Sequence, residues 1–203
     1  MVQAHLPDPG RLKELLVPNA RVWLRPATKT ARRTRYTLAL VETPTCELVS
    51  LVTTLPNALV EEALEEKRVA QLTDWGIVAR EHTWGRSRFD FLLGRPGCRM
   101  LLEVKSVTLV KGDRGFFPDA VTTRGTRHVR ELASAIDEGF EATVLFVVQR
   151  KDASSVTAAS SIDPKFAEAL SEARAAGVHL LGYRCEVTLD NARITEPIPV
   201  SAG

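Results

Sequence analysis

The chain has 203 residues, enough for one large or two small domains with a sizeable buried core. Apolar residues make up 44% and charged residues 26%, which excludes wholesale disorder. The net charge of +2 indicates no partner by itself, and no apolar run is long enough to cross a bilayer. Cys46, Cys98 and Cys185 have neither disulfide nor metal-ligand spacing, and no signal peptide is visible. We therefore expect a soluble cytoplasmic protein without a membrane partner.

The first part of the chain predicts short β-strands with little helix. Alternating residues favour strands over 20–24 and 35–42, with a further strand over 46–53 and a helical turn or two over 10–16. Short strands linked by polar loops are typical of a small OB-type barrel, a common platform for single-stranded nucleic acid. We assign this barrel to residues 1–54.

A basic segment lies within this barrel. Residues 15–41 contain no acidic side chain. Trp23 and Tyr36 could stack on bases while the neighbouring cations bind phosphates, although a solvated face and a flexible loop would explain the same pattern. The candidate nucleic-acid-binding residues are Arg21, Arg25, Lys29, Arg32, Arg33 and Arg35.

Residues 55–203 alternate between strand and helix patterns. Asn57 is positioned to cap a helix over 57–72, and the turn 94–97 predicts a hairpin. The sequence predicts strands over 76–80, 87–93, 99–109, 142–148 and 178–183, helices over 126–138 and 164–176, and a loop over 151–161. This order implies a right-handed crossover and a mixed α/β sheet.

The most informative cluster combines Asp90 with the segment Glu103-Val104-Lys105. Side chains alternate along a strand, so Glu103 and Lys105 share one face, and a hairpin would bring Asp90 close to Glu103. Two carboxylates suit Mg²⁺ or Mn²⁺, which activates water and neutralises a phosphodiester, while the lysine steadies developing negative charge. The spacing resembles the PD-(D/E)xK nuclease motif, with Phe89 at the proline position.

The alternative for this cluster is a surface ion pair of little value. The very apolar surroundings of Glu103 and Lys105, within 100–110, favour a functional role, because buried charges are costly unless they are used or paired. On the preceding helix Glu62 could supply a third carboxylate. On helix geometry alone, Glu61, Glu65 or Glu66 would serve as well.

A second cluster follows the apolar Phe116-Phe117-Pro118 and a loop over 119–125. Its basic side chains stand at the start of the next helix, where backbone amides also attract phosphate. They are Arg124, Arg127, His128 and Arg130. They are either a solvated helix face with a partly buried histidine, or a grip on the nucleic-acid backbone beside the metal site.

Five stretches together resemble the sugar fermentation stimulation protein (SfsA) family in identity, order and spacing. The combination of PDAVT and RG-x-x-H with EVKSV is the most specific part. The stretches are HLPDPGRLKELL at 5–16, NALVEEAL at 57–64, RFDFL at 88–92, EVKSV at 103–107 and FFPDAVTTRGTRHVREL at 116–132.

This resemblance implies an N-terminal OB-like barrel, a nuclease-like α/β domain, DNA binding and a link to sugar-utilisation genes. By matching positions, it implies catalytic roles for Glu62, Asp90, Glu103, Lys105 and His128, with Asp90, Glu103 and Glu62 holding the metal. Members of the family usually carry about two more strands before the HLPDPGRL segment. Here only residues 1–4 precede it, so either the start lies upstream or the barrel lacks its first strands.

The sequence leaves three functions open. The first is a Mg²⁺- or Mn²⁺-dependent nuclease acting on DNA or RNA, with DNA as the favoured partner. The second is a non-catalytic DNA-binding regulator, and a homodimer is compatible with either. The third, a small-molecule enzyme, is disfavoured because no glycine-rich phosphate loop is present.

Overall fold

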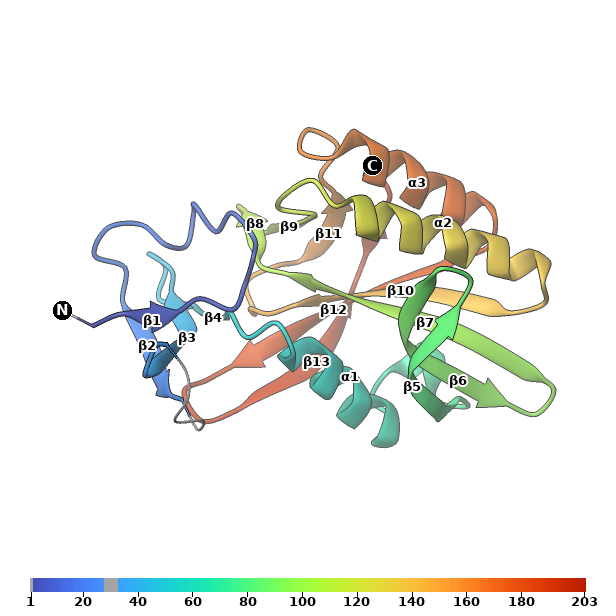
Figure 1. The fold of residues 1–203 in the computed structure, drawn as a ribbon, viewed down its shortest axis with the longest axis horizontal. Helices are drawn as coiled ribbons and strands as arrows, with labels where there is room; N and C mark the ends of the chain where they lie inside the picture. The colour runs from blue at the N-terminus through green and yellow to red at the C-terminus, as the bar shows by residue number, and fades with distance from the viewer. Residues whose placement is uncertain (1, 28–32) are drawn as a thin grey trace.

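The computed structural model describes residues 2–27 and 33–203 and contains a small N-terminal sheet beside a larger α/β domain (Figure 1). Strand β3 (Tyr36–Glu42) is the centre of the N-terminal sheet. Strand β2 (Val22–Pro26) pairs with one edge of β3, whereas β1 (Ala4–His5) and β4 (Leu48–Ser50) share the other edge. Within the described residues these four strands form an open sheet, packed on Leu12, Leu15 and the apolar side chains of β3 and β4.

The larger domain is built on a six-stranded mixed sheet in the order β13-β12-β10-β7-β6-β5. Strands β5, β6 and β7 form an antiparallel meander, β10 and β12 run parallel to β7, and β13 is antiparallel to β12. The bounds are β5 (Gly76–Trp84), β6 (Ser87–Arg95), β7 (Cys98–Val107), β10 (Glu141–Val148), β12 (His179–Val187) and β13 (Ala192–Ile198). The predicted hairpin turns at Gly97, whose φ of 77° suits glycine.

Helices cover both faces of this sheet (Figure 1). Helices α2 (Thr123–Asp137) and α3 (Pro164–Ala175) pack on one face, and α1 (Leu55–Glu65) packs on the other. Thr122 caps α2 by accepting from the Gly125 amide, and Asp163 caps α3 by accepting from the Phe166 amide. Strand β10 is buried throughout its apolar run because both layers cover it. None of the helices described is long and apolar enough to span a membrane.

Two predicted elements were wrong. The expected helix over 57–72 is α1 followed by a separate 3₁₀ turn (Ala70–Leu72), and it begins before Asn57, so Asn57 is not its cap. The expected loop over 151–161 contains β11 (Ser155–Ala158), which pairs with β9 (Arg114–Phe117) and β14 (Val200–Ser201). With β8 (Leu109–Lys111), these strands form a third sheet that the sequence did not predict.

Candidate active site

The site lies where strands β6 and β7 separate. Their pairing extends from the hairpin turn as far as Phe91 opposite Leu102. The next pair in this register would be Asp90 and Glu103, but here the Val104 amide donates to the Asp90 side chain at 2.7 Å. The Asp90 carboxylate thus lies between the two strands, at a fork that opens the sheet next to Glu103.

Asp90 is held at the fork by two donors. Its Oδ2 accepts from the Val104 amide, and its Oδ1 accepts from Asn57 Nδ2 at 2.6 Å. Burial and then the Glu103 charge raise the pKa of Asp90, in spite of these hydrogen bonds. A negative charge is therefore costly here, and a nearby cation would lower that cost.

Glu103 is buried beside two basic side chains. The residue is only 5% exposed, and its Oε1 lies 2.6 Å from Lys105 Nζ and 2.7 Å from His128 Nδ1. Burial raises its pKa, but Lys105 and His128 outweigh this effect and bring the pKa below the usual value, so the group is a carboxylate. Its Oε2 is buried and has no hydrogen-bond partner among the residues that the structure describes, which leaves one oxygen of a buried charge unsatisfied.

The two carboxylates are supported from opposite faces of the sheet. Asn57 of α1 orients Asp90, whereas His128 of α2 orients Glu103. Across the described residues, no three His, Cys, Asp or Glu side chains are grouped so as to hold a metal ion. A cation at this site would therefore rely on two carboxylates, with water or substrate oxygens completing its shell, as is usual for Mg²⁺.

Glu62, the predicted third carboxylate, is directed elsewhere. It forms an ion pair with Arg68 and is half-exposed. Its neighbour Glu61 lies one helical turn after Asn57, on the same face of α1, and contacts Arg80 at 2.8 Å. If α1 contributes an acid to the site, the geometry favours Glu61 over Glu62.

The basic segment of the N-terminal sheet is placed only in part. Arg21 lies 3.3 Å from Glu42, so its charge is partly compensated. Arg21 is exposed in spite of this pair, and so are three further candidates, Arg25, Arg33 and Arg35. Lys29 and Arg32 lie outside the described residues. Trp23 and Tyr36 are half-buried on neighbouring strands.

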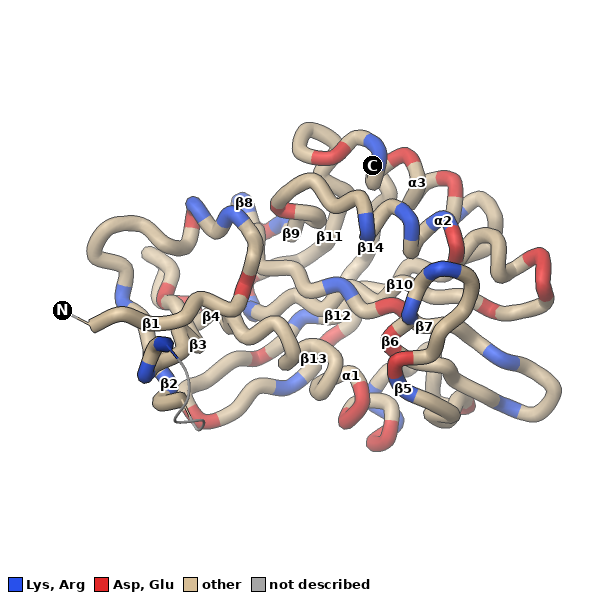
Figure 2. The backbone as a smooth tube through the Cα atoms, viewed as in Figure 1, with Lys and Arg blue, Asp and Glu red and all other residues tan. Residues whose placement is uncertain are grey.

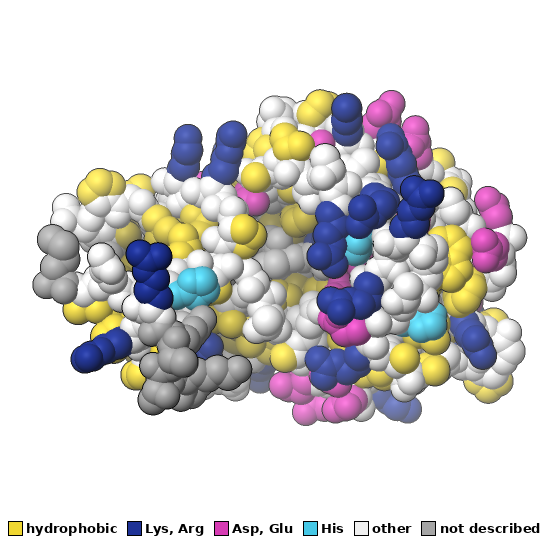
Figure 3. Space-filling view, viewed as in Figure 1, with side chains coloured by type: hydrophobic (Ala, Val, Ile, Leu, Met, Phe, Trp, Pro, Cys, Tyr) yellow, Lys and Arg dark blue, Asp and Glu magenta, His cyan; other side chains and the backbone are white. Residues whose placement is uncertain are grey.

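The predicted basic cluster of α2 lies next to the fork. On the face shown in Figure 3, Lys and Arg side chains gather around a histidine near the middle of the molecule. Arg124 donates from Nε to His128 Nε2 at 3.3 Å, and Arg127 is exposed. Arg130 is 3.9 Å from Glu172, a weak exposed pair. Figure 2 shows the contrast between the basic start of α2 and the acidic α1.

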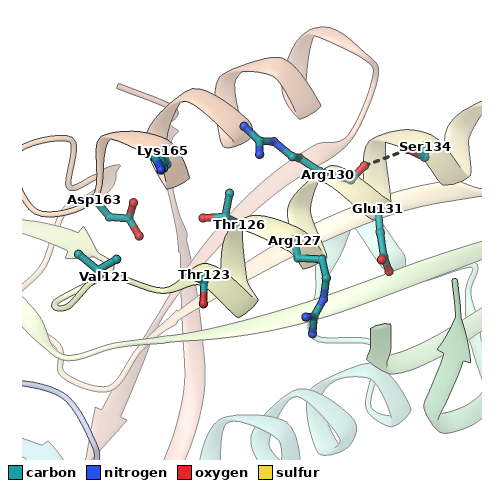
Figure 4. A pocket seen from close by; sticks show the side chains of 9 residues that line it. All are labelled: Val121, Thr123, Thr126, Arg127, Arg130, Glu131, Ser134, Asp163 and Lys165. Atoms are coloured by element: carbon teal, nitrogen blue, oxygen red, sulfur yellow. Dashed lines mark hydrogen bonds between the residues drawn. The ribbon is translucent and has the colours of Figure 1, made fainter. Parts of the chain in front are cut away.

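A pocket between α2 and the start of α3 adjoins this basic surface (Figure 4). Arg127, Arg130 and Lys165 line it together with Thr123. Asp163 also lines the pocket. Its carboxylate accepts hydrogen bonds from the backbone amides of Thr122 and Phe166, at the starts of α2 and α3. Glu131 adds a second carboxylate to the lining, so the pocket combines three cationic side chains with two acidic ones.

A second pocket lies beside Lys105, and sequence reasoning missed several of its residues. The N-terminal segment supplies one wall with Asp8 and Gly10, and the PDAVT segment supplies another with Asp119. The two segments are joined because the Arg11 amide donates to Asp119 Oδ2 at 3.0 Å. A Cβ on Gly10 would lie 2.0 Å from the same oxygen, so a larger residue would displace the Asp119 carboxylate from this contact. Both segments belong to the stretches that resemble the family, at 5–16 and 116–132, and this was the signal in the sequence that could have indicated the pocket.

Comparison with known proteins agrees with this architecture. The family model described as "SfsA N-terminal OB domain" matches residues 1–51, and the one described as "Sugar fermentation stimulation protein RE domain" matches residues 54–191. The chain is 50% identical over 200 residues to the sugar fermentation stimulation protein homolog of Shouchella clausii (strain KSM-K16), covering 98% of this chain and 86% of that protein. It is 44% identical over 203 residues to the homolog of Geobacter metallireducens (strain ATCC 53774 / DSM 7210 / GS-15), covering 98% and 87%.

Among solved structures, the fold matches that of Pyrococcus furiosus SfsA in complex with Ca²⁺, with a TM-score of 0.89 and 28% identity over 98% of this chain and 85% of that one. Fold and matches define a two-part protein, an N-terminal OB domain followed by a mixed-sheet α/β domain. The chain belongs to the sugar fermentation stimulation protein family. The predicted family and fold class are confirmed.

Proposed function

We propose that this protein is a divalent-cation-dependent nuclease that binds nucleic acid, preferentially DNA, and hydrolyses phosphodiesters at the β6–β7 fork. The observation that carries the proposal is the unpartnered Oε2 of Glu103, a buried carboxylate oxygen next to a second carboxylate whose pKa is raised. A purely structural ion pair would be expected to satisfy both oxygens, since unpaired buried charge is costly.

The residues at the fork fit a hard cation. Asp90 and Glu103 would hold it, because each carboxylate oxygen of Asp90 accepts only one hydrogen bond and Glu103 Oε2 accepts none. The Ca²⁺ complex of the Pyrococcus furiosus relative supports a divalent ion; Mg²⁺ or Mn²⁺ is the proposed cofactor in the cell. When bound, such an ion lowers the pKa of coordinated water and neutralises charge on the phosphodiester.

Lys105 supplies a positive charge to the site. Its side chain is 11% exposed, its ammonium contacts Glu103, and it borders the pocket beside the fork. From this position it can donate to a phosphate oxygen or orient the attacking water, stabilising the negative charge that develops on the phosphate. Arg124, which contacts His128, and the exposed Arg127 both belong to the start of α2 and can bind neighbouring phosphates.

The test is cleavage of labelled single- and double-stranded DNA and RNA in Mg²⁺, Mn²⁺ or EDTA. We expect cleavage of at least one substrate with Mg²⁺ or Mn²⁺ and none in EDTA. Lys105→Met should abolish cleavage while retaining cation binding. Lys111→Met, which removes an exposed lysine on β8, is the matched control and should cleave normally.

The alternative is a DNA-binding regulator without turnover. It would be supported if the wild-type protein bound the substrates well but cleaved none of them with either cation. Equal cleavage by the wild type and Lys105→Met would also contradict the proposal, because it would place the activity outside the fork.

A further inference from the structure

His128 contacts both a candidate cation ligand and a candidate phosphate ligand. Its ring is 2% exposed, with Nδ1 2.7 Å from Glu103 Oε1 and Nε2 3.3 Å from Arg124 Nε. The edge of the ring also packs against Phe89, with ring centroids 5.6 Å apart. His128 and Arg124 are four residues apart on α2, so the helix itself brings the two side chains together.

The proton positions follow from the donors available. A guanidinium can only donate, so His128 Nε2 is the acceptor in its contact with Arg124 Nε. The other ring nitrogen, Nδ1, is then the one that can donate to Glu103 Oε1. Both nitrogens are hydrogen-bonded within a buried ring, so neither is turned toward a substrate.

We propose that His128 is a positioning residue that orients two groups of the site at once: Arg124 toward a substrate phosphate and Glu103 toward the cation. This role rests on the nuclease function proposed above, and it replaces the catalytic role that the sequence predicted for His128.

Each half of this role has a separate structural basis. Anchoring Nε fixes the plane of the Arg124 guanidinium, whose two terminal nitrogens remain available at the exposed start of α2 for bidentate contact with phosphate. On the other side, His128 and Lys105 both donate to Glu103 Oε1, which leaves Oε2 as the free ligand oxygen. Partners of this kind fix the orientation of metal ligands.

Two substitutions of His128 separate its contact with Glu103 from its contact with Arg124. The amide of Asn reaches about as far as the Nδ1 atom of histidine, so His128→Asn can still donate to Glu103 but no longer reaches Arg124. The amide of Gln reaches about as far as Nε2, so His128→Gln can accept from Arg124 but loses the bond to Glu103. Both measurements avoid cleavage: calorimetric titration with Ca²⁺ alone, and binding of a labelled DNA oligonucleotide in EDTA over a range of salt concentrations.

His128→Gln should weaken Ca²⁺ binding by about 10- to 100-fold, the usual effect of losing a partner of a metal ligand, and should bind DNA normally. His128→Asn should bind Ca²⁺ normally and lose about one unit of the salt slope of DNA binding, the same loss as Arg124→Gln. Arg127→Gln is the control, since it should weaken DNA binding without changing Ca²⁺ affinity. The proposal is overturned if the two His128 variants show the same pattern of defects.

A measurement on the wild-type protein covers the case in which the variants do not fold. Nitrogen NMR of ¹⁵N-histidine-labelled protein should show His128 with its proton on Nδ1 and none on Nε2. A protonated Nε2 would overturn the proposal. The Ca²⁺ titration, the DNA-binding assay and the NMR measurement do not depend on turnover. An absence of cleavage would therefore contradict the proposed nuclease while leaving these tests of His128 intact.

Discussion

Replacement of Asp90 separates the effect of its charge from that of its hydrogen bonds. In Asp90→Ala the buried Val104 amide loses its acceptor, and an unsatisfied buried donor costs about 1–3 kcal/mol. Asp90→Asn can keep both contacts: its Oδ1 accepts from Val104, and its amide donates to Asn57 once the Asn57 amide has turned over. The free energy of unfolding should therefore be about 1–3 kcal/mol lower for Asp90→Ala than for Asp90→Asn.

The negative charge of Asp90 lowers the stability of the folded protein, whereas its hydrogen bonds raise it. Burial and the Glu103 charge raise the pKa of Asp90 on folding. A carboxyl of this kind contributes its full stability below its unfolded pKa and loses it as the pH rises through the folded pKa. In EDTA at neutral pH, Asp90→Asn should thus be at least as stable as the wild type, and the difference should disappear near pH 4, the ordinary pKa of aspartate.

Thermal unfolding with EDTA or with Ca²⁺ measures both effects. For a chain of this size, 1 kcal/mol corresponds to roughly 2–4 °C in the melting temperature. Ca²⁺ at about 100 times its dissociation constant should stabilise the wild type by about 2.7 kcal/mol and Asp90→Asn by much less. Equal melting temperatures of the Asn and Ala variants in EDTA would show that the Asp90 hydrogen bonds do not stabilise the fork. A full Ca²⁺ shift in Asp90→Asn would show that the Asp90 charge does not hold the cation.

Three further outcomes are expected. Glu61→Gln should lower the cleavage rate whereas Glu62→Gln should not, and the reverse result would restore the assignment made from the sequence. Charge reversal of Arg33 and Arg35 together should weaken binding to all DNA sequences and flatten its salt dependence, and an unchanged slope would show that they are only a solvated face. Tyr183→Phe removes a buried hydroxyl that joins β12 to the 3₁₀ turn, which should lower stability by about 0.5–1.5 kcal/mol in denaturant unfolding; an unchanged midpoint would show that this bond contributes nothing.

Local signals in the sequence predicted the hairpin that carries the site. The turn from Gly94 to Gly97 and the alternation of the flanking strands depend on residues close in the chain, and the structure places Asp90 next to the 103–105 segment. The point at which the strands separate was not predictable, because it depends on an aspartate side chain replacing a backbone acceptor.

Contacts between residues far apart in the chain explain the wrong predictions. Asparagine is a common helix-capping residue, but the side-chain amide of Asn57 donates to Asp90, 33 positions away. The helix starts earlier than this cap signal indicated, so the sequence did not show which side of the helix faces the site. Adjacent residues differ by about 100° around a helix, and the sequence therefore could not decide between Glu61 and Glu62. Strand β11 was missed because its four residues pair in parallel with a strand about 40 positions away, a contact with no local signature.

The central claim is that the two carboxylates at the fork support phosphodiester hydrolysis. The most direct test is the single-turnover cleavage rate of a labelled DNA substrate in Mg²⁺ or Mn²⁺ for the wild type and for Glu103→Gln, which keeps the shape of the side chain and removes its charge. The substitution should slow cleavage by at least about 100-fold without reducing DNA binding in EDTA. Equal rates for the two proteins, or no cleavage by a wild-type protein that binds the DNA well, would contradict the claim.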